Sequence, residues 1–365
     1  MQTLISAPPG QLKFGANNGF QEELRRRVGS YFQRTGRQQR DCPRMYVKTA
    51  IVLGWLLASY VALVVFAERW WLAVPLSISL GLSMAAVGFN IQHDGGHGAY
   101  SNFRWVNKLM AMSLDLLGGS SYVWARKHNS IHHSYSNVTG HDEDIDIGVF
   151  GRLSPHQRRL KFHRMQHFYL WILYGLLPFK WQLFDDFWHV TAGHIGGHRL
   201  GRPKGWDLAT FIGGKAAFFS LAWVIPQFFH PVWAVLLIYV AASLVQGIVL
   251  GVVFQLAHCV EETNFPMPRQ DTGRLAAAWA VHQVETTADF SPQNCLLTWF
   301  IGGLNYQIEH HLFPKICHVH YPALSQLVDE TCREFGLRYV VHDNLRVALA
   351  SHFRWLRQMG MSCPA

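Results

Sequence analysis

Histidine is over-represented in this chain, with 21 residues among 365. Three short clusters hold the informative spacings: HDGGH at 93–97, HNSIHH at 128–133 and QIEHH at 307–311. A neutral imidazole binds borderline transition metals such as iron, copper and zinc. A four-coordinate zinc ion needs fewer donors than these clusters offer, whereas two iron ions would use them and leave positions open for dioxygen. The pattern therefore favours a site for two metal ions.

Helical spacing divides the second cluster between two ions. Residues four apart share a helix face, so His128 and His132 are expected to point at one ion. His133 follows directly and points about 100° away, which favours the second ion. His93 and His97 have the same spacing as the first pair, although the two intervening glycines weaken the expectation of a helix there. The adjacent histidines of QIEHH are expected to separate in the same way.

Residues outside the clusters extend the candidate site. His258 ends an apolar segment, where an ionisable side chain is costly without a partner, and is therefore a candidate ligand. Carboxylates fix ligating imidazoles by accepting the second ring N–H. Asp94 and Glu309 are candidates for this role, as are the aspartates of 142–146 unless they form a solvated loop, and His282 is a supporting residue. The predicted ligands are His93, His97, His128, His132, His133, His258, His310 and His311, with Gln307 as an additional candidate.

Two further histidine pairs have the same spacing, His163 with His167 and His194 with His198. They lie among arginines and lysines, which repel a metal ion. We interpret them as solvated or interfacial histidines.

Four apolar segments are placed to carry the clusters. Each approaches or exceeds the length of about 20 residues that one bilayer crossing requires. Glu68 and Arg69 form a tight turn after the first segment, and His230 and Pro231 form one after the third, so the segments pair into two hairpins. The predicted spans are residues 46–67, 70–91, 208–229 and 232–257.

Positive charge orients these hairpins. Arginine and lysine are frequent before the first span, whereas the turns contain Arg69 alone, so the N-terminus is expected in the cytoplasm. An even number of crossings returns the C-terminus to the same side, and residues 92–207 and 258–365 then share it. The apolar stretches 105–119 and 168–181 are too short or interrupted to cross and are expected to be interfacial or re-entrant. A fifth and sixth crossing would instead separate the clusters.

The N-terminal region has its own pattern. Phe20 and Leu24 begin a series of apolar residues at helical spacing within 20–37, with arginines opposite, which predicts an amphipathic helix on an anionic membrane surface. The predicted organisation is a cytosolic N-terminal segment at 1–44 and a membrane domain at 45–365. The expected fold class is all-α and integral to the membrane, with four transmembrane helices in two hairpins and a cytosolic, histidine-rich helical cap.

The order HDGGH, HNSIHH and QIEHH around two membrane hairpins resembles the membrane fatty acid desaturases. Gln307 at the first position of the last cluster matches the front-end branch of that family, and HQVETTADFS and GGLNYQIEHHLFPKICHVHYPAL are further similar stretches. The likeness extends from about Phe20 to Met359 and is strongest to bacterial acyl-lipid or linoleoyl-CoA desaturases. It implies a multi-pass protein of the bacterial inner membrane with its active site in the cytoplasm.

The resemblance also implies a reaction. At a non-haem centre of two iron ions, dioxygen and two electrons convert two adjacent methylene groups of an acyl lipid or acyl-CoA into a cis double bond. The clustered histidines would be the iron ligands, with His258 and Gln307 matching less securely. Many eukaryotic relatives carry a fused haem domain with an HPGG motif, which this chain lacks. A separate ferredoxin or cytochrome is therefore expected to supply electrons, attracted by the basic stretch 152–164, and no nucleic acid partner is expected.

Other functions share parts of this pattern. A histidine-box hydroxylase or ketolase has the same metal site but places oxygen on carbon, and the QIEHH cluster disfavours it. A zinc-dependent membrane hydrolase needs about three histidines and a water, fewer donors than the clusters supply. A non-catalytic membrane binding protein is the third alternative.

Overall fold

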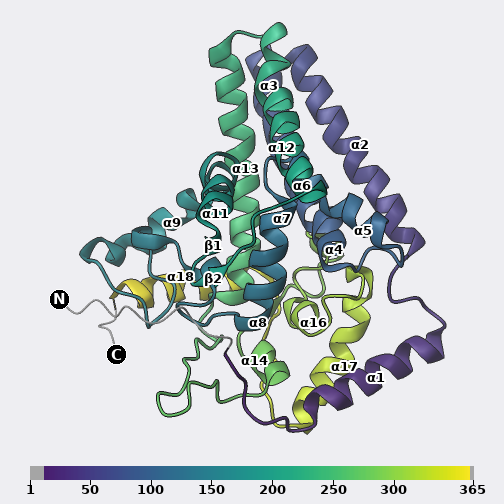
Figure 1. Cartoon of the computed structure of the whole chain (residues 1–365), viewed down its shortest axis with the longest axis vertical. Coiled ribbons are helices and arrows are strands. Elements are labelled where there is room, and N and C mark those ends of the chain that lie inside the picture. The colour runs from purple at the N-terminus through teal and green to yellow at the C-terminus, as the bar shows by residue number, and fades with distance from the viewer. Residues whose placement is uncertain (1–11, 362–365) are drawn as a thin grey trace.

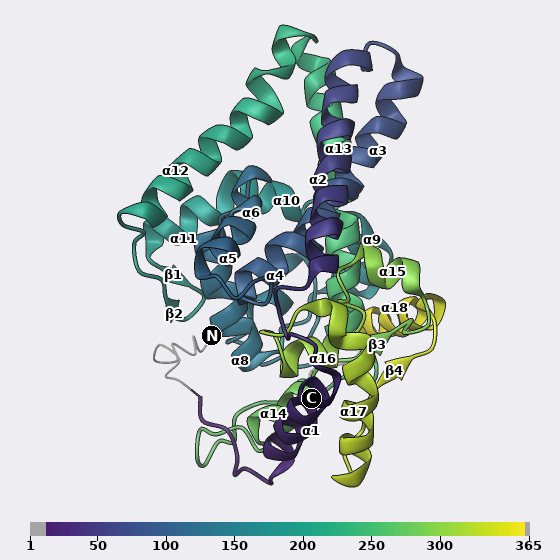
Figure 2. The same cartoon turned by 90° about the vertical axis from the view of Figure 1, so that its right-hand side faces the viewer.

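The long helices of the chain stand together at one end of the molecule, and shorter helices and loops form a broad cap at the other, as Figure 1 and the perpendicular view in Figure 2 show. The computed structural model describes residues 12–361, and helices make up nearly all of its regular structure. The predicted all-α membrane fold with a helical cap is confirmed.

The first hairpin consists of two of the four helices that are long and apolar enough to cross a membrane. Its first arm is α2 (Pro43–Phe66), which begins with a proline at a position where the missing N–H is not needed. Its second arm begins as α3 (Trp70–Val87) and continues through the π-helical turn η1 (Gly88–Gln92) into α4 (His93–His97). The second arm therefore ends on the first histidine cluster.

The second hairpin has the same plan. Its first arm begins as α12 (Trp206–Phe219) and ends in the short turns η7 (Ser220–Val224) and η8 (Pro226–Phe228). Its second arm is α13 (Val232–His258), which ends on a candidate ligand. All four predicted spans and both tight turns are confirmed. Within the first hairpin α3 packs against α2. It also packs against α13 of the second hairpin, where a Cβ at Gly81 of α3 would lie 2.5 Å from the carbonyl oxygen of Ala242.

The other two apolar stretches form short helices that do not cross. Residues 105–119 contribute α5 (Arg104–Ala111) and α6 (Ser113–Leu116), and residues 168–181 contribute α9 (Gln166–Tyr174) and α10 (Leu177–Lys180). Within 12–361 the structure has four helices of spanning length, so the predicted short, non-crossing segments are confirmed. The second stretch continues through the π-helical turn η6 (Trp181–Asp185) into α11 (Asp186–Ala192).

The cap is built from short helices joined by loops. Two pairs of two-residue strands fasten it: β1 (His194–Ile195) runs antiparallel to β2 (His198–Arg199), and β3 (Asp289–Phe290) runs parallel to β4 (Val341–His342). The helices of the cap beyond those already named are α7 (Ser121–Trp124), η2 (Ala125–His132), α8 (His133–Tyr135), η3 (Glu143–Ile145), η4 (Gly148–Phe150), η5 (Lys161–Met165), α14 (Trp279–Glu285), α15 (Cys295–Phe300), α16 (Gln307–Leu312), η9 (His318–His320), α17 (Tyr321–Glu334) and α18 (Leu345–Met361).

The N-terminal amphipathic helix forms, as α1 (Phe20–Thr35), but it does not lie on a membrane. Its apolar face is buried inside the protein, where Phe20 and Leu24 pack with residues of α14, α16 and α17. Figure 1 shows α1 at the end of the cap away from the spans. The predicted membrane surface is wrong, because α17 and its neighbours already cover the face that would insert.

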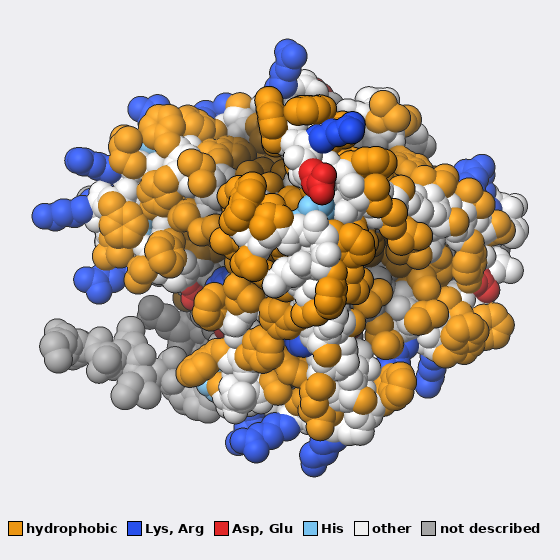
Figure 3. All heavy atoms as spheres, turned by 90° about the horizontal axis from the view of Figure 1, so that it is seen from above, with side chains coloured by type: hydrophobic (Ala, Val, Ile, Leu, Met, Phe, Trp, Pro, Cys, Tyr) orange, Lys and Arg blue, Asp and Glu red, His pale blue; other side chains and the backbone are white. Residues whose placement is uncertain are grey.

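The surface around the spans suits a bilayer. Figure 3, which looks at the hairpin turns from above, shows apolar side chains over most of this face and Lys and Arg side chains mainly around its edge. Exposed aromatic residues on the short helices next to the spans include Phe103 just before α5, Trp105 of α5 and Phe168 of α9. Aromatic and cationic side chains are typical of headgroup depth.

Candidate metal centre

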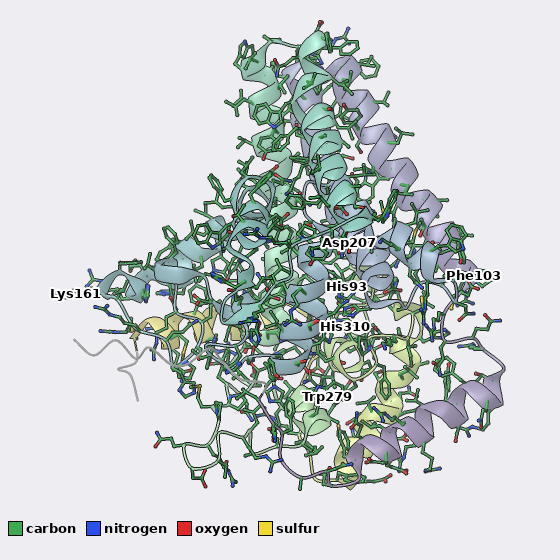
Figure 4. All side chains as sticks on the ribbon, in the orientation of Figure 1. His93, Phe103, Lys161, Asp207, Trp279 and His310 are labelled. Atoms are coloured by element: carbon green, nitrogen blue, oxygen red, sulfur yellow. The ribbon has the colours of Figure 1, made fainter. Side chains whose placement is uncertain are left out.

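The three histidine clusters meet where the cap joins the spans. HDGGH forms α4 at the end of the second span, HNSIHH ends η2 and begins α8, and QIEHH lies in α16. Figure 4 shows His93 and His310 close together in the middle of the molecule. All eight predicted histidine ligands are at most 9% exposed.

Seven of these histidines form two groups. Within each group the ring nitrogens that could bind an ion lie within 4.8 Å of one another. Donors that share an ion bound at about 2.1 Å are at most about 4.2 Å apart, so small side-chain movements would bring each group onto one ion. The first group is His93, His97, His128 and His310, and the second is His132, His258 and His311.

The HNSIHH segment is not the α-helix that its spacing predicts. Residues Ala125–His132 form a π-helix, in which hydrogen bonds run from i to i+5 and residues five apart come close to sharing a face. His133 Nε2 accordingly lies 3.3 Å from His128 Nε2, and His132 joins the second group. The assumption of α-helical geometry is therefore wrong. His133 also groups with the two histidines of α16, which places it between the two sets.

The glycines of HDGGH are needed for close packing, and α4 is helical despite them. A Cβ at Gly95 would lie 2.6 Å from the backbone nitrogen of Ala111, and a Cβ at Gly96 would lie 2.2 Å from Trp124 Cζ3. The Trp124 ring in turn stacks on His128, with centroids 4.5 Å apart. The two glycines thus let the first and second clusters approach each other.

Hydrogen bonds orient the second group from outside. His132 Nδ1 lies 3.1 Å from Asp142 Oδ2, and His311 Nδ1 lies 2.8 Å from Gln283 Oε1. A donated Nδ1–H fixes the ring and leaves the Nε2 lone pair for an ion. Asp142 belongs to the acidic run that the sequence suggested for this role, so one of the predicted carboxylates is confirmed as a partner of an imidazole.

Two further histidines have partners that the sequence did not reveal. His258 Nδ1 lies 3.3 Å from the carbonyl oxygen of Thr286, and His310 Nδ1 lies 3.2 Å from the hydroxyl of Tyr321. Thr286 lies in the HQVETTADF stretch. The similarity of this stretch to a known family was the one feature of the sequence that pointed to it. These contacts again turn Nε2 toward the centre.

Several ring nitrogens of the candidate ligands lack hydrogen-bond partners among the described residues. Burying a polar atom without a hydrogen bond is costly, and a bound metal ion would supply the missing interaction. The donor set therefore fits metal ions that accept imidazole. The buried nitrogens without a partner are Nε2 of His97, His132, His310 and His311, and Nδ1 of His133.

Asp94 and His282 have other partners than the predicted ones. Asp94 Oδ2 lies 2.9 Å from His318 Nδ1, and His318 belongs to neither of the two histidine groups. The His282 ring is 1% exposed and packs edge-on against Phe14 at 5.5 Å. Asp94 therefore orients the imidazole of His318 rather than that of a predicted ligand, and His282 contacts an aromatic ring instead.

Glu309 is also directed away from the histidines. The Tyr339 hydroxyl donates to Asp289 Oδ2 at 2.6 Å and to Glu309 Oε1 at 3.1 Å. Burial raises the pKa of Asp289 to about 6, and burial together with the neighbouring Asp289 carboxylate raises the pKa of Glu309 well above its usual range. This buried carboxyl pair anchors α16 from behind rather than orienting a ligand.

Gln307 reaches the second group. Its Nε2 lies 3.0 Å from His258 Nε2, and the side chain is 4% exposed. Its amide could thus bind an ion or hydrogen-bond to His258. As expected, neither arginine-rich pair contributes to the described histidine groups. The expectation of solvated histidines is wrong for the first pair, because His163 and His167 are buried and His163 Nε2 lies 2.9 Å from the carbonyl oxygen of Val149.

Burial keeps most of the cap imidazoles neutral, which is the form that binds metal. His132 is different. Burial opposes its protonation, but the Asp142 carboxylate and the hydrogen bond to it raise the pKa of His132 above its usual value. Burial lowers the pKa well below the usual value for His128, His133, His310 and His311.

The fold and the site define a helical membrane protein with four spans and two buried groups of histidines where the cap joins the spans. A family model described as fatty acid desaturase matches residues 69–342. The chain is 39% identical to the sn-1 linoleoyl-lipid 6-desaturase of Arthrospira platensis, over 98% of this chain and 97% of that protein. It is 37% identical to the enzyme of the same name in Synechocystis sp., over 96% and 98% of the two chains.

A third relative is the acyl-lipid (8-3)-desaturase of Physcomitrium patens, 37% identical over 95% of this chain and 72% of that protein. The chain belongs to the fatty acid desaturase family. It is a membrane fatty acid desaturase and thus an oxidoreductase, as the resemblance of its histidine clusters implied.

Proposed function

We propose that this desaturase inserts a cis double bond into an acyl chain carried on a membrane lipid, using two non-haem iron ions, dioxygen and two electrons. The acyl-lipid substrate rests on the names of the relatives in Arthrospira, Synechocystis and Physcomitrium, each of which is called an acyl-lipid or linoleoyl-lipid enzyme. A linoleoyl lipid is accordingly the first substrate to test.

The two groups of buried imidazoles carry the proposal for two ions. Seven histidines supply more nitrogen donors than one four-coordinate ion uses, and His133 lies between the sets. When bound, two iron ions would supply the redox chemistry by which dioxygen, two electrons and two protons remove two vicinal hydrogens and yield two waters. Imidazole-rich coordination with few carboxylates is suited to such an ion.

The protein's own residues prepare the site for this chemistry. Asp142 and Gln283 hold His132 and His311 in the tautomer that leaves Nε2 free, and Trp124 stacks on His128. The ligands are buried at the inner ends of α4 and α13, so bulk water is kept from a reactive centre.

The orientation follows from charge and from the position of the cap. We place the cap, both termini and the active site in the cytoplasm of a bacterial inner membrane, with residues 1–44 as a cytosolic segment and 45–365 as the desaturase domain. The turns between spans carry Arg69 as their sole arginine or lysine, which supports this orientation.

A separate ferredoxin or cytochrome would donate the electrons on the cap face opposite the spans. Trp279 of α14 is half-buried there, and its indole N–H donates to the carbonyl of His133 at 3.3 Å, so it links this face to the centre. Figure 4 places Trp279 below the histidines and Lys161 at the far edge of the molecule. This arrangement favours the Trp279 face over the basic stretch 152–164 as the docking surface.

Expression in a host that lacks the activity, fed with linoleic acid, tests the function. Mass spectrometry should locate one new double bond in lipid-bound chains, and purified protein should contain about two irons per chain. His132→Ala should abolish the product and lower the metal content, whereas His194→Ala, which removes an exposed histidine outside both groups, should change neither. A hydroxylated product would instead support the hydroxylase alternative, and zinc without iron would refute the proposed centre.

A further inference from the structure

A pocket of about 330 Å³ lies between η5–α9 and α18, away from the histidine centre. Two arginine–phenylalanine pairs, each spaced four residues apart, face each other across it: Arg164 with Phe168, and Arg357 with Phe353. Phe353 and Arg357 share a face of α18, whereas Arg164 lies in the 3-10 helix η5 and Phe168 in α9 directly after it. The two aromatic rings that line the pocket meet edge-on, with centroids 5.8 Å apart.

The polar lining of the pocket suits an anion. Neither Arg164 nor Arg357 forms an ion pair within the described part of the chain, and none of the described lining residues is acidic. His167 also lines the pocket; its ring packs against Phe353 at 5.1 Å, it is 6% exposed, and its buried Nδ1 has no hydrogen-bond partner among the described residues. Paired guanidinium groups bind phosphate-like oxyanions well, because each offers several donors in a fixed geometry.

The pocket also lies at the depth of lipid headgroups. α9 packs against the fourth span, where a Cβ at Gly251 would lie 2.7 Å from Tyr174 Cβ. Gly251 precedes the inner end of α13 at His258 by two turns, so the α9 face that exposes Phe168 and Ile172 adjoins the inner part of the bilayer. Arg164 stands one turn before Phe168, at the boundary between apolar and polar surroundings.

We propose that this pocket binds the anionic headgroup of a membrane lipid, with the phosphate between Arg164 and Arg357 and the start of the acyl chains against Phe168 and Phe353. The apolar surroundings distinguish this occupant from an acidic protein, which would dock in water. The site goes beyond the desaturase reaction and does not depend on the metal centre, so it is tested without turnover.

Native mass spectrometry of the detergent-purified full chain, titrated with short-chain phosphatidylglycerol, measures this binding. The proposal expects phosphatidylglycerol to bind about tenfold more tightly than phosphatidylcholine of the same chain length. Arg164→Ala/Arg357→Ala should abolish that preference, and Arg164→Lys/Arg357→Lys should retain part of it. The matched control Arg25→Ala/Arg34→Ala removes two exposed arginines of α1, far from the pocket, and should leave the preference unchanged.

Three results would overturn the assignment. Equal phosphatidylglycerol affinity in the pocket variant and the α1 variant would show that headgroup binding is not local to this pocket. Inorganic phosphate that binds as tightly as the lipid would point to a free-anion site. If Arg164→Ala/Arg357→Ala kept the lipid preference but the protein was no longer reduced by an acidic electron donor, the pocket would be a protein-docking surface. As a control, each variant should have the same thermal unfolding temperature and metal content as the parent, so that only folded proteins are compared.

Discussion

Replacing Asp142 by Asn tests whether an orienting carboxylate controls the metal centre. Asp142 is 2% exposed, and its Oδ2 accepts hydrogen bonds from His132 Nδ1 at 3.1 Å and from the backbone N–H of Asn137 at 2.9 Å. Its Oδ1 accepts from the N–H of Asp144 at 3.0 Å. An amide has one oxygen for these three donors, so in either orientation its NH₂ group faces an N–H that has lost its acceptor.

The expected loss follows from this contact. Removing a partner that holds a ligating histidine typically costs 10- to 100-fold in metal affinity or activity, which corresponds to about 1.4–2.7 kcal/mol. For Asp142→Asn, the yield of desaturated lipid per chain, measured by mass spectrometry, should decrease by about 10- to 100-fold. The metal content per chain, measured by elemental analysis, should decrease with it. The loss of activity should be largest at limiting iron concentration, because the substitution lowers the affinity for the ion held by the group of His132, His258 and His311.

A matched substitution in the same acidic run provides the control. Asp146 is exposed and caps the N–H of Gly148, so Asp146→Asn removes an equal charge without touching a histidine. If both variants kept the metal content and product yield of the parent, the assignment of Asp142 to His132 would be refuted. Equal losses in both would show that the charge of the loop, rather than the hydrogen bond, supports the centre.

Three further outcomes are expected. Lys215→Leu should destabilise the protein by about 3–5 kcal/mol in detergent unfolding, because the buried Asp186 carboxylate 2.8 Å away loses its cation; the double variant with Asp186→Leu should recover much of this. Gly96→Ala should cost about 1–3 kcal/mol and lower metal content by displacing Trp124, whereas Gly54→Ala, with open space around it, should do neither. Burial raises the pKa of Asp289 to about 6, so the stability that its protonated form contributes is present below pH 4 and lost as pH rises through 6; thermal unfolding should show this decline, and Asp289→Asn should reduce it.

The spans were predictable because length and apolar composition suffice to define them, and the three clusters were predictable because histidine is rare enough for its spacing to carry information. The π-helix at Ala125–His132 was not, since nothing in HNSIHH distinguishes i→i+5 from i→i+4 hydrogen bonding. Asp142 is close in sequence to His132 and was found, whereas Gln283 and Tyr321 reach their histidines from other helices. Contacts of that kind depend on tertiary packing, which a local pattern does not contain.

The two basic, aromatic-containing segments show why charge pattern alone cannot name a partner. The sequence suggested a membrane for α1 and a protein for residues 152–164, and the structure favours the reverse. The apolar face of α1 packs against α17, so its exposed arginines, Arg25 and Arg34 among them, lie on the part of the cap away from the spans, beside α14, whose Trp279 donates to the carbonyl of His133. Arg164 instead adjoins a helix packed on a span. Both segments attract anions, and their depth relative to the bilayer decides whether the anion belongs to a protein or to a lipid.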